Sequence, residues 1–125
     1  MSANQIRIVA IALLFLVIFA SGYWLSHSGK PRHAAILTIH KLASLAAVVF
    51  LGVVAYQTNR VTSLGAVEWT ALVSAGALFL GTMATGGLVS LSNPMPAAIS
   101  TLHRMTPFLI ALSTAIALYL LLGRR

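Results

Sequence analysis

The sequence predicts an all-α membrane protein, an antiparallel bundle of four transmembrane helices built from two tandem two-helix repeats. Of its 125 residues, 59% are apolar and only 7% are charged, and the mean hydropathy is +0.96. Because soluble domains carry about 25% charged residues, this composition excludes an ordinary water-soluble globule. The eight cations lie singly or in small groups at the ends of apolar runs, so the net charge of +7 indicates membrane anchors and no nucleic-acid partner.

Four apolar runs are each long enough to cross the roughly 30 Å hydrocarbon layer of a bilayer. They are Ile6–Leu25, Ala34–Tyr56, Glu68–Leu91 and Ala97–Leu122. The runs are continuous and rich in Leu, Ala, Ile and Val, which favours helices over the alternating pattern of transmembrane strands. The connections between them are short, so consecutive helices must run antiparallel. We therefore expect a single bundle over residues 1–125.

Prolines mark the expected helix starts and one bend. Pro31 precedes the second run and Pro96 the fourth, where a missing amide donor costs little. Pro107 lies inside the fourth run and cannot donate to the carbonyl of His103, which predicts a bend there. The equivalent position in the second run is Ser44, whose hydroxyl can bond to the carbonyl four residues earlier.

The two halves of the chain align when one is shifted by 63 residues, which predicts an internal duplication of residues 1–62 and 63–125. In this register Thr38-Ile-His-Lys-Leu falls on Thr101-Leu-His-Arg-Met, Pro31 on Pro94 and Tyr56 on Tyr119. Each half has two spans, so the copies share one orientation in the membrane. The two histidines of the repeated motif are then expected to share one role.

His40 and His103 are the candidate metal ligands. Each lies six residues past the start of its run, which places both imidazoles at one depth, about 9 Å below the same rim. An ionisable side chain at that depth needs the bundle interior or a partner. Two facing neutral imidazoles at equal depth suit bis-histidine ligation of the iron of one haem b. The alternatives are a hydrogen bond across the bundle, another metal or a proton relay.

Cations and small residues near the pair are the candidate cofactor contacts. A haem carries two propionates, and long cationic side chains directly after the histidines could reach them at the rim. A macrocycle also needs small side chains on the neighbouring helices, although small residues are common at every membrane helix interface. The predicted cofactor-binding residues are Lys41, Arg104, Arg32, Lys30 and His33 on the cationic rim, and Gly22, Gly86 and Gly87, next to Ser21 and Thr85, at the depth of the histidines.

The other histidines have a simpler interpretation. His27 and His33 flank a polar loop, so we expect them to be solvated residues of the interface. An alternative is that together with Met95 they form a copper site on that rim. The chain has no cysteine, which excludes thiolate metal sites and iron–sulfur clusters.

Paired histidines on the second and fourth helices resemble the four-helix b-type membrane cytochromes and, more narrowly, one half of haem A synthase. The segment Leu80-Gly-Thr-Met-Ala-Thr-Gly-Gly-Leu-Val-Ser-Leu, a Pro-containing turn and Thr101-Leu-His-Arg are similar to that family's passage from third to fourth helix. The resemblance implies one haem held by His40 and His103. In that family a glutamate near the histidines takes part in oxidising the haem methyl group. Here Glu68, at the opposite rim, is the only acidic residue, which argues against the synthase reaction.

The sequence therefore predicts a b-type cytochrome that transfers electrons between membrane quinol and a redox partner, with no catalytic side chains assigned. Whether it acts as an enzyme is left open. One alternative is a haem-binding assembly or structural subunit of a larger complex. Another is a small four-helix transporter, although such exporters normally place an acidic residue inside the first helix and this chain has none there.

The cations also bear on orientation. The side of the termini has Arg7, Arg60, Arg124 and Arg125, and the other side has Lys30, Arg32, Lys41 and Arg104, which is a tie. If Lys41 and Arg104 are left out of this count because they pair with propionates, more cations remain on the side of the termini. Both termini are then expected in the cytoplasm. The expected location is the cytoplasmic membrane of a bacterium or archaeon.

Overall fold

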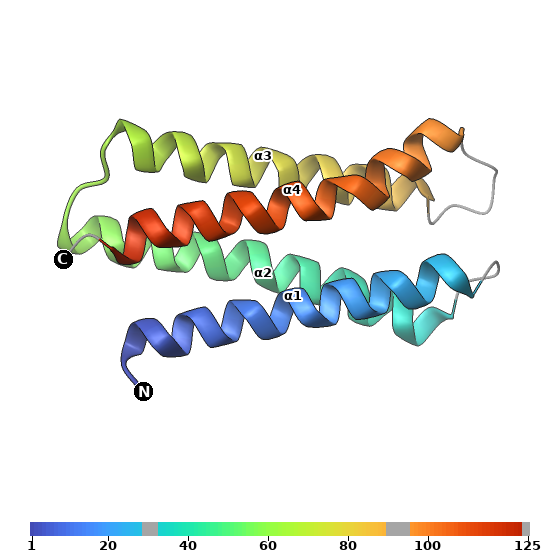
Figure 1. Cartoon of the computed structure of the whole chain (residues 1–125), viewed down its shortest axis with the longest axis horizontal. Helices are drawn as coiled ribbons and strands as arrows, with labels where there is room; N and C mark the ends of the chain where they lie inside the picture. Colours follow the sequence, from blue (N-terminus) through green and yellow to red (C-terminus); the bar gives the residue numbers. More distant parts are fainter. Residues whose placement is uncertain (29–32, 90–95, 124–125) are drawn as a thin grey trace. The chain divides into compact units, whose positions relative to one another are not determined.

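A computed structural model describes residues 1–28, 33–89 and 96–123, and this part of the chain is almost entirely helical (Figure 1). Its helices are 24 to 28 residues long, or about 36–42 Å at 1.5 Å per residue. All four are long and apolar enough to cross a membrane. They are α1 (Ala3–His27), α2 (Ala34–Val61), α3 (Ala66–Val89) and α4 (Ala97–Leu122).

Local hydrogen bonds explain where two of these helices begin. At the start of α1, the Gln5 amide donates to Ser2 Oγ at 3.2 Å and the Ser2 amide donates to Gln5 Oε1 at 2.8 Å, a complete capping box. At the start of α3, the Gly65 amide donates to Glu68 Oε2 at 3.0 Å. The single carboxylate of the chain thus stabilises a helix N-terminus, where the helix dipole favours negative charge.

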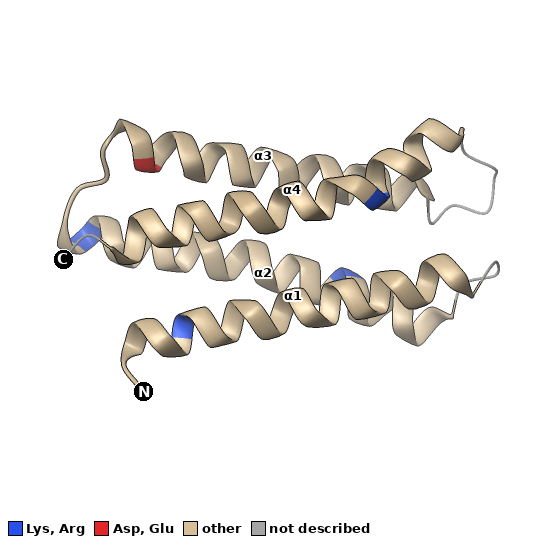
Figure 2. Cartoon of the chain, viewed as in Figure 1, with Lys and Arg blue, Asp and Glu red and all other residues tan. Residues whose placement is uncertain are grey.

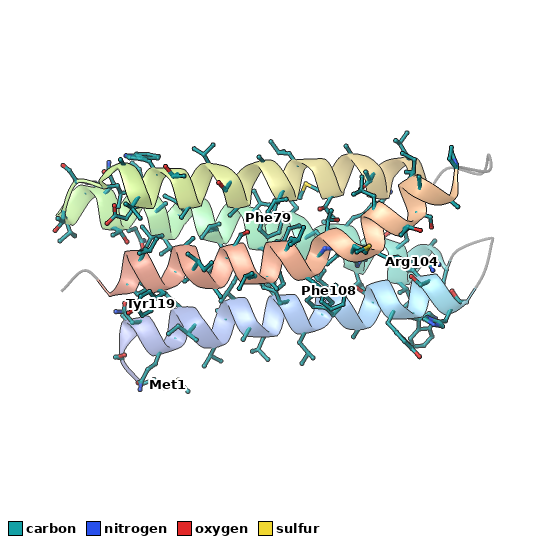
Figure 3. All side chains as sticks on the ribbon, turned by 45° about the horizontal axis from the view of Figure 1, so that its top comes forward. Met1, Phe79, Arg104, Phe108 and Tyr119 are labelled. Carbon is teal, nitrogen blue, oxygen red and sulfur yellow. The ribbon has the colours of Figure 1, made fainter. Side chains whose placement is uncertain are left out.

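The chain divides into two compact units, Met1–Phe50 and Leu51–Arg125. In the first, α1 packs against the N-terminal part of α2, and Ile11, Ile18, Leu25, Ala43 and Ala47 are buried. In the second, α3 packs against α4. Its buried apolar side chains are Leu51, Val54, Leu64, Ala75, Phe79, Ile110, Ala117, Leu118 and Leu121, of which Phe79 is labelled in Figure 3.

Most large apolar side chains lie outside these narrow cores. Leu16 and Leu80, for example, are 63% and 66% exposed, which suits helices whose outer surface meets lipid. Trp24 and Tyr119, near helix ends, are also exposed, as is typical of aromatic residues at the membrane interface. Charged side chains are few along the described helices (Figure 2).

The predicted all-α class is confirmed, with four membrane-length helices in two tandem helix pairs. α4 continues through Pro107 as one helix, and its first turns, drawn in orange, are inclined to the remainder (Figure 1). This agrees with the predicted bend. In α2 the Ser44 hydroxyl donates to the His40 carbonyl at 2.8 Å, also as predicted.

Candidate functional site

His40 is bound to α1 through Nδ1. Its Nδ1 lies 3.1 Å from the carbonyl oxygen of Ile18 and 2.9 Å from Ser21 Oγ. The Ser21 hydroxyl lies 2.6 Å from the Val17 carbonyl, one turn earlier in its own helix. A hydroxyl and a backbone carbonyl of one helix turn therefore hold the imidazole of the neighbouring helix.

His103 is bound to α3 in the same way. Its Nδ1 lies 3.0 Å from the carbonyl oxygen of Thr82 and 3.2 Å from Thr85 Oγ1. The Thr85 hydroxyl lies 3.0 Å from the Thr82 carbonyl and 3.1 Å from the Gly81 carbonyl. We call the Ile18 carbonyl with Ser21 the first clamp, and the Thr82 carbonyl with Thr85 the second clamp.

The two clamps correspond one to one but in an unexpected register. The clamp residues of the second unit lie 64 residues after those of the first, whereas the histidines lie 63 residues apart. The segment between clamp and histidine is thus one residue longer in the first copy. The matched positions are Ile18 with Thr82, Ser21 with Thr85, Gly22 with Gly86, and His40 with His103.

The clamps favour one tautomer of each imidazole. A backbone carbonyl can only accept a hydrogen bond, so the contacts with the Ile18 and Thr82 carbonyls assign the proton to Nδ1. The hydroxyls of Ser21 and Thr85 have carbonyls of their own helices as acceptors, so their oxygens can accept from Nδ1–H. In the neutral imidazole the lone pair then lies on Nε2, and this is the form in which histidine binds a metal.

Two of the three predicted glycines face the imidazoles directly. A Cβ built at Gly22 would lie 3.1 Å from Cε1 of His40, and one at Gly86 would lie 2.7 Å from Cε1 of His103. A Cβ at Gly87 would meet nothing within 4 Å. The structure thus brings Gly22 and Gly86 against the imidazole rings of His40 and His103. The predicted role of these glycines was clearance for a macrocycle.

The predicted propionate partners lie next to the histidines on the outside of the helix pairs. Lys41 and Arg104 are exposed, and Figure 3 labels Arg104 in the first part of α4. The chain has no acidic side chain except Glu68, whose Oε2 accepts the Gly65 amide. His33 is exposed, and the predicted contacts Lys30 and Arg32 lie outside the described residues.

His27 is engaged locally on α1. Its ring stacks on Tyr23 with centroids 4.1 Å apart, and its Nδ1 lies 2.9 Å from the Tyr23 carbonyl. Met95, the third member of the alternative copper site, lies outside the described residues. Within residues 1–28, 33–89 and 96–123, no group of three or more His, Cys, Asp or Glu side chains could hold a metal ion without a cofactor.

The structure also shows the interaction that the sequence left as an alternative, a hydrogen bond from each histidine to a neighbouring helix. That bond is compatible with a haem ligand, because metal-bound histidines usually donate their other ring N–H to a carbonyl or carboxylate. The donor set therefore fits haem.

Sequence reasoning placed Ser21 and Thr85 at the right depth but missed their bonds to the rings. The repeated pairs Ser21-Gly22 and Thr85-Gly86 were the available signal, hidden by the one-residue difference in register.

No family model, no curated protein and no solved structure matches this chain. The resemblance to haem A synthase therefore rests on the short motifs quoted above.

Proposed function

We propose that this chain is a membrane b-type cytochrome in which His40 and His103 would each bind the iron of haem b through Nε2, with one haem per chain. The observation that carries the proposal is the duplicated clamp. In both units a carbonyl accepts a hydrogen bond from Nδ1, at 3.1 Å for His40 and 3.0 Å for His103. Two histidines held in one tautomer, with the lone pair on Nε2, have the electronic form that axial ligation requires.

A hydrogen bond between helices would not by itself require this set of residues. Ser, Thr, Asn or Gln can form such bonds between membrane helices. Here the bonding residue is histidine in both units, a cation follows it in both units, and a glycine faces its ring in both units. Lys41 and Arg104 are the proposed partners of the two haem propionates, because charge-assisted bonds to carboxylates are the strong ones.

When bound, haem would supply one-electron redox chemistry. His40 and His103 would hold the iron through imidazole nitrogens and leave it no site for oxygen, and Lys41 and Arg104 would neutralise the propionates. The single acidic residue is committed to the start of α3, so no carboxylate is at hand for acid–base chemistry beside the histidines. The proposed reaction is therefore electron transfer, with a membrane quinol as donor and a membrane or soluble redox protein as acceptor.

The test is the reduced-minus-oxidised absorption spectrum of the protein purified after expression with ample haem. We expect a single b-type α-band in the wild type and its loss in His40→Ala and in His103→Ala. His27→Ala is the matched control, because His27 is exposed and its Nδ1 lies 2.9 Å from the Tyr23 carbonyl of its own helix. Circular dichroism of each variant establishes that the helices are retained.

A wild type without haem, or an unchanged spectrum in both folded His→Ala variants, overturns the proposal. Electron transfer is tested separately by mixing the oxidised holoprotein with a short-chain quinol. Reduction within the mixing time of a stopped-flow experiment supports a quinol donor. Reduction no faster than that of free haem in the same detergent overturns that part of the proposal.

A further inference from the structure

We infer that Ser21 and Thr85 are positioning residues that set the donor strength of the two axial histidines by accepting hydrogen bonds from Nδ1–H. The inference rests on the proposed haem ligation and extends it to the control of the reduction potential. It is carried by the two short contacts of Ser21 Oγ and Thr85 Oγ1 with Nδ1 of His40 and His103, 2.9 and 3.2 Å long.

Each hydroxyl is the middle member of a chain of hydrogen bonds. The Ser21 hydroxyl donates to the Val17 carbonyl at 2.6 Å and accepts from His40 Nδ1–H. A hydroxyl that donates strongly becomes a better acceptor, because hydrogen bonds in a chain polarise one another. The Thr85 hydroxyl occupies the same position with its own helix and His103, over longer distances of 3.0 Å and 3.2 Å.

This arrangement acts on the metal through the ring. Pulling the Nδ1 proton toward an acceptor makes Nε2 more basic, and a more basic axial ligand stabilises the oxidised iron over the reduced iron. The clamp hydroxyls are therefore expected to lower the reduction potential of the haem. The Ser21 hydroxyl lies 2.6 Å from its nearest helix carbonyl and 2.9 Å from Nδ1, against 3.0 and 3.2 Å for the Thr85 hydroxyl, so the serine should have the larger effect.

The chain contains matched hydroxyls that bond to helix carbonyls in the same way but do not contact an imidazole. The Ser44 hydroxyl donates to the His40 carbonyl at 2.8 Å, close to the same ligand but on its backbone. The Thr70 hydroxyl donates to the Ala66 carbonyl at 2.7 Å in α3. Replacing these hydroxyls changes polarity and helix bonding as much as replacing the clamp hydroxyls, and leaves the rings untouched.

The experiment compares Ser21→Ala and Thr85→Val with the controls Ser44→Ala and Thr70→Val in the full-length protein loaded with haem. We expect a more positive midpoint potential and about a 10–100-fold loss of haem affinity in the clamp variants, as for the loss of other outer-shell partners of metal-bound histidine. The controls should match the wild type. Thr85→Ser keeps the hydroxyl and should restore the wild-type potential.

A measurement on the haem-free protein separates this inference from the proposed function. Nitrogen-15 NMR of the labelled histidines reports which ring nitrogen is protonated. We expect Nδ1–H at both His40 and His103 in the wild type, and a population of the other tautomer in Ser21→Ala and Thr85→Val. Absence of haem from the wild type overturns the proposed function and leaves this tautomer measurement as the test of the clamps.

Two results overturn the inference. One is Nε2–H as the dominant tautomer in the haem-free wild type. The other is a haem-loaded protein in which Ser21→Ala and Thr85→Val have the same midpoint potential as Ser44→Ala and Thr70→Val. A potential that rises in the clamp variants and returns in Thr85→Ser supports it, because a merely structural role of the hydroxyl would not move the potential in this pattern.

Discussion

Substituting the glycine beside His103 is the sharpest structural perturbation that the site offers. In Gly86→Ala the new Cβ would lie 2.7 Å from Cε1 of His103, a separation that real Cβ contacts essentially never show. The imidazole cannot turn away freely, because Nδ1 is bonded to the Thr82 carbonyl at 3.0 Å. Either that bond or the packing of α3 on α4 must give way.

Three glycines form a graded series from which the magnitude follows. Overpacking a fitted contact costs about 1–3 kcal/mol, whereas replacing glycine by alanine inside a helix gains about 0.5–1 kcal/mol. Gly87→Ala has open space and should only gain. Gly22→Ala, with a contact of 3.1 Å to His40, should be close to neutral. Gly86→Ala should lose about 1–2 kcal/mol after the helix gain is subtracted.

The assay is reversible unfolding of the purified variants in one detergent, with haem retention measured in parallel. The expected order of stability is Gly87→Ala above Gly22→Ala above Gly86→Ala, with haem loss greatest in the last. A Gly86→Ala protein as stable as Gly87→Ala, with normal haem content, would show that the ring does not sit against α3 as described.

Two further predictions follow from single side chains. Thr114 is 2% exposed and its Oγ1 has no hydrogen-bond partner among the described residues. The isosteric change Thr114→Val should therefore raise the free energy of unfolding by about 1 kcal/mol. A free energy of unfolding below that of the wild type would mean that the hydroxyl has a partner in the membrane. Lys41→Gln and Arg104→Gln should each weaken haem binding about 10-fold, since a charge-assisted bond contributes about 1.5 kcal/mol or more. In a haem titration Arg60→Gln is the control, and equal affinities of all three variants would exclude the propionate role.

The fold followed closely from the sequence because the need to satisfy backbone hydrogen bonds in the membrane dominates the fold. A chain in hydrocarbon must satisfy its backbone internally, so long apolar runs become helices. Ala34 and Ala97 were predicted as helix starts and Leu122 as a helix end, and all three agree. α1 begins at Ala3, before the predicted start at Ile6. The capping box of Ser2 determines this start, and hydropathy does not contain that signal.

The site was predictable only in part. The sequence identified His40 and His103 as a matched pair from a repeated motif, and the structure shows each of them bonded to a neighbouring helix. Their anchoring could not be foreseen, because one acceptor in each clamp is a backbone carbonyl, at Ile18 and at Thr82, and a carbonyl leaves no trace in the residue type. The offset of 64 against 63 residues also concealed the match between Ser21 and Thr85. Long-range contacts between helices depend on register to within one residue, which composition and periodicity do not fix.

Electron paramagnetic resonance of the oxidised, haem-loaded protein, combined with its haem-to-chain ratio, tests the central claim most directly. Ligation by His40 and His103 predicts one haem per chain and a low-spin ferric signal typical of two imidazole ligands, lost in either His→Ala variant and kept in His27→Ala. A high-spin signal in the wild type, or a protein that binds no haem, would contradict the account.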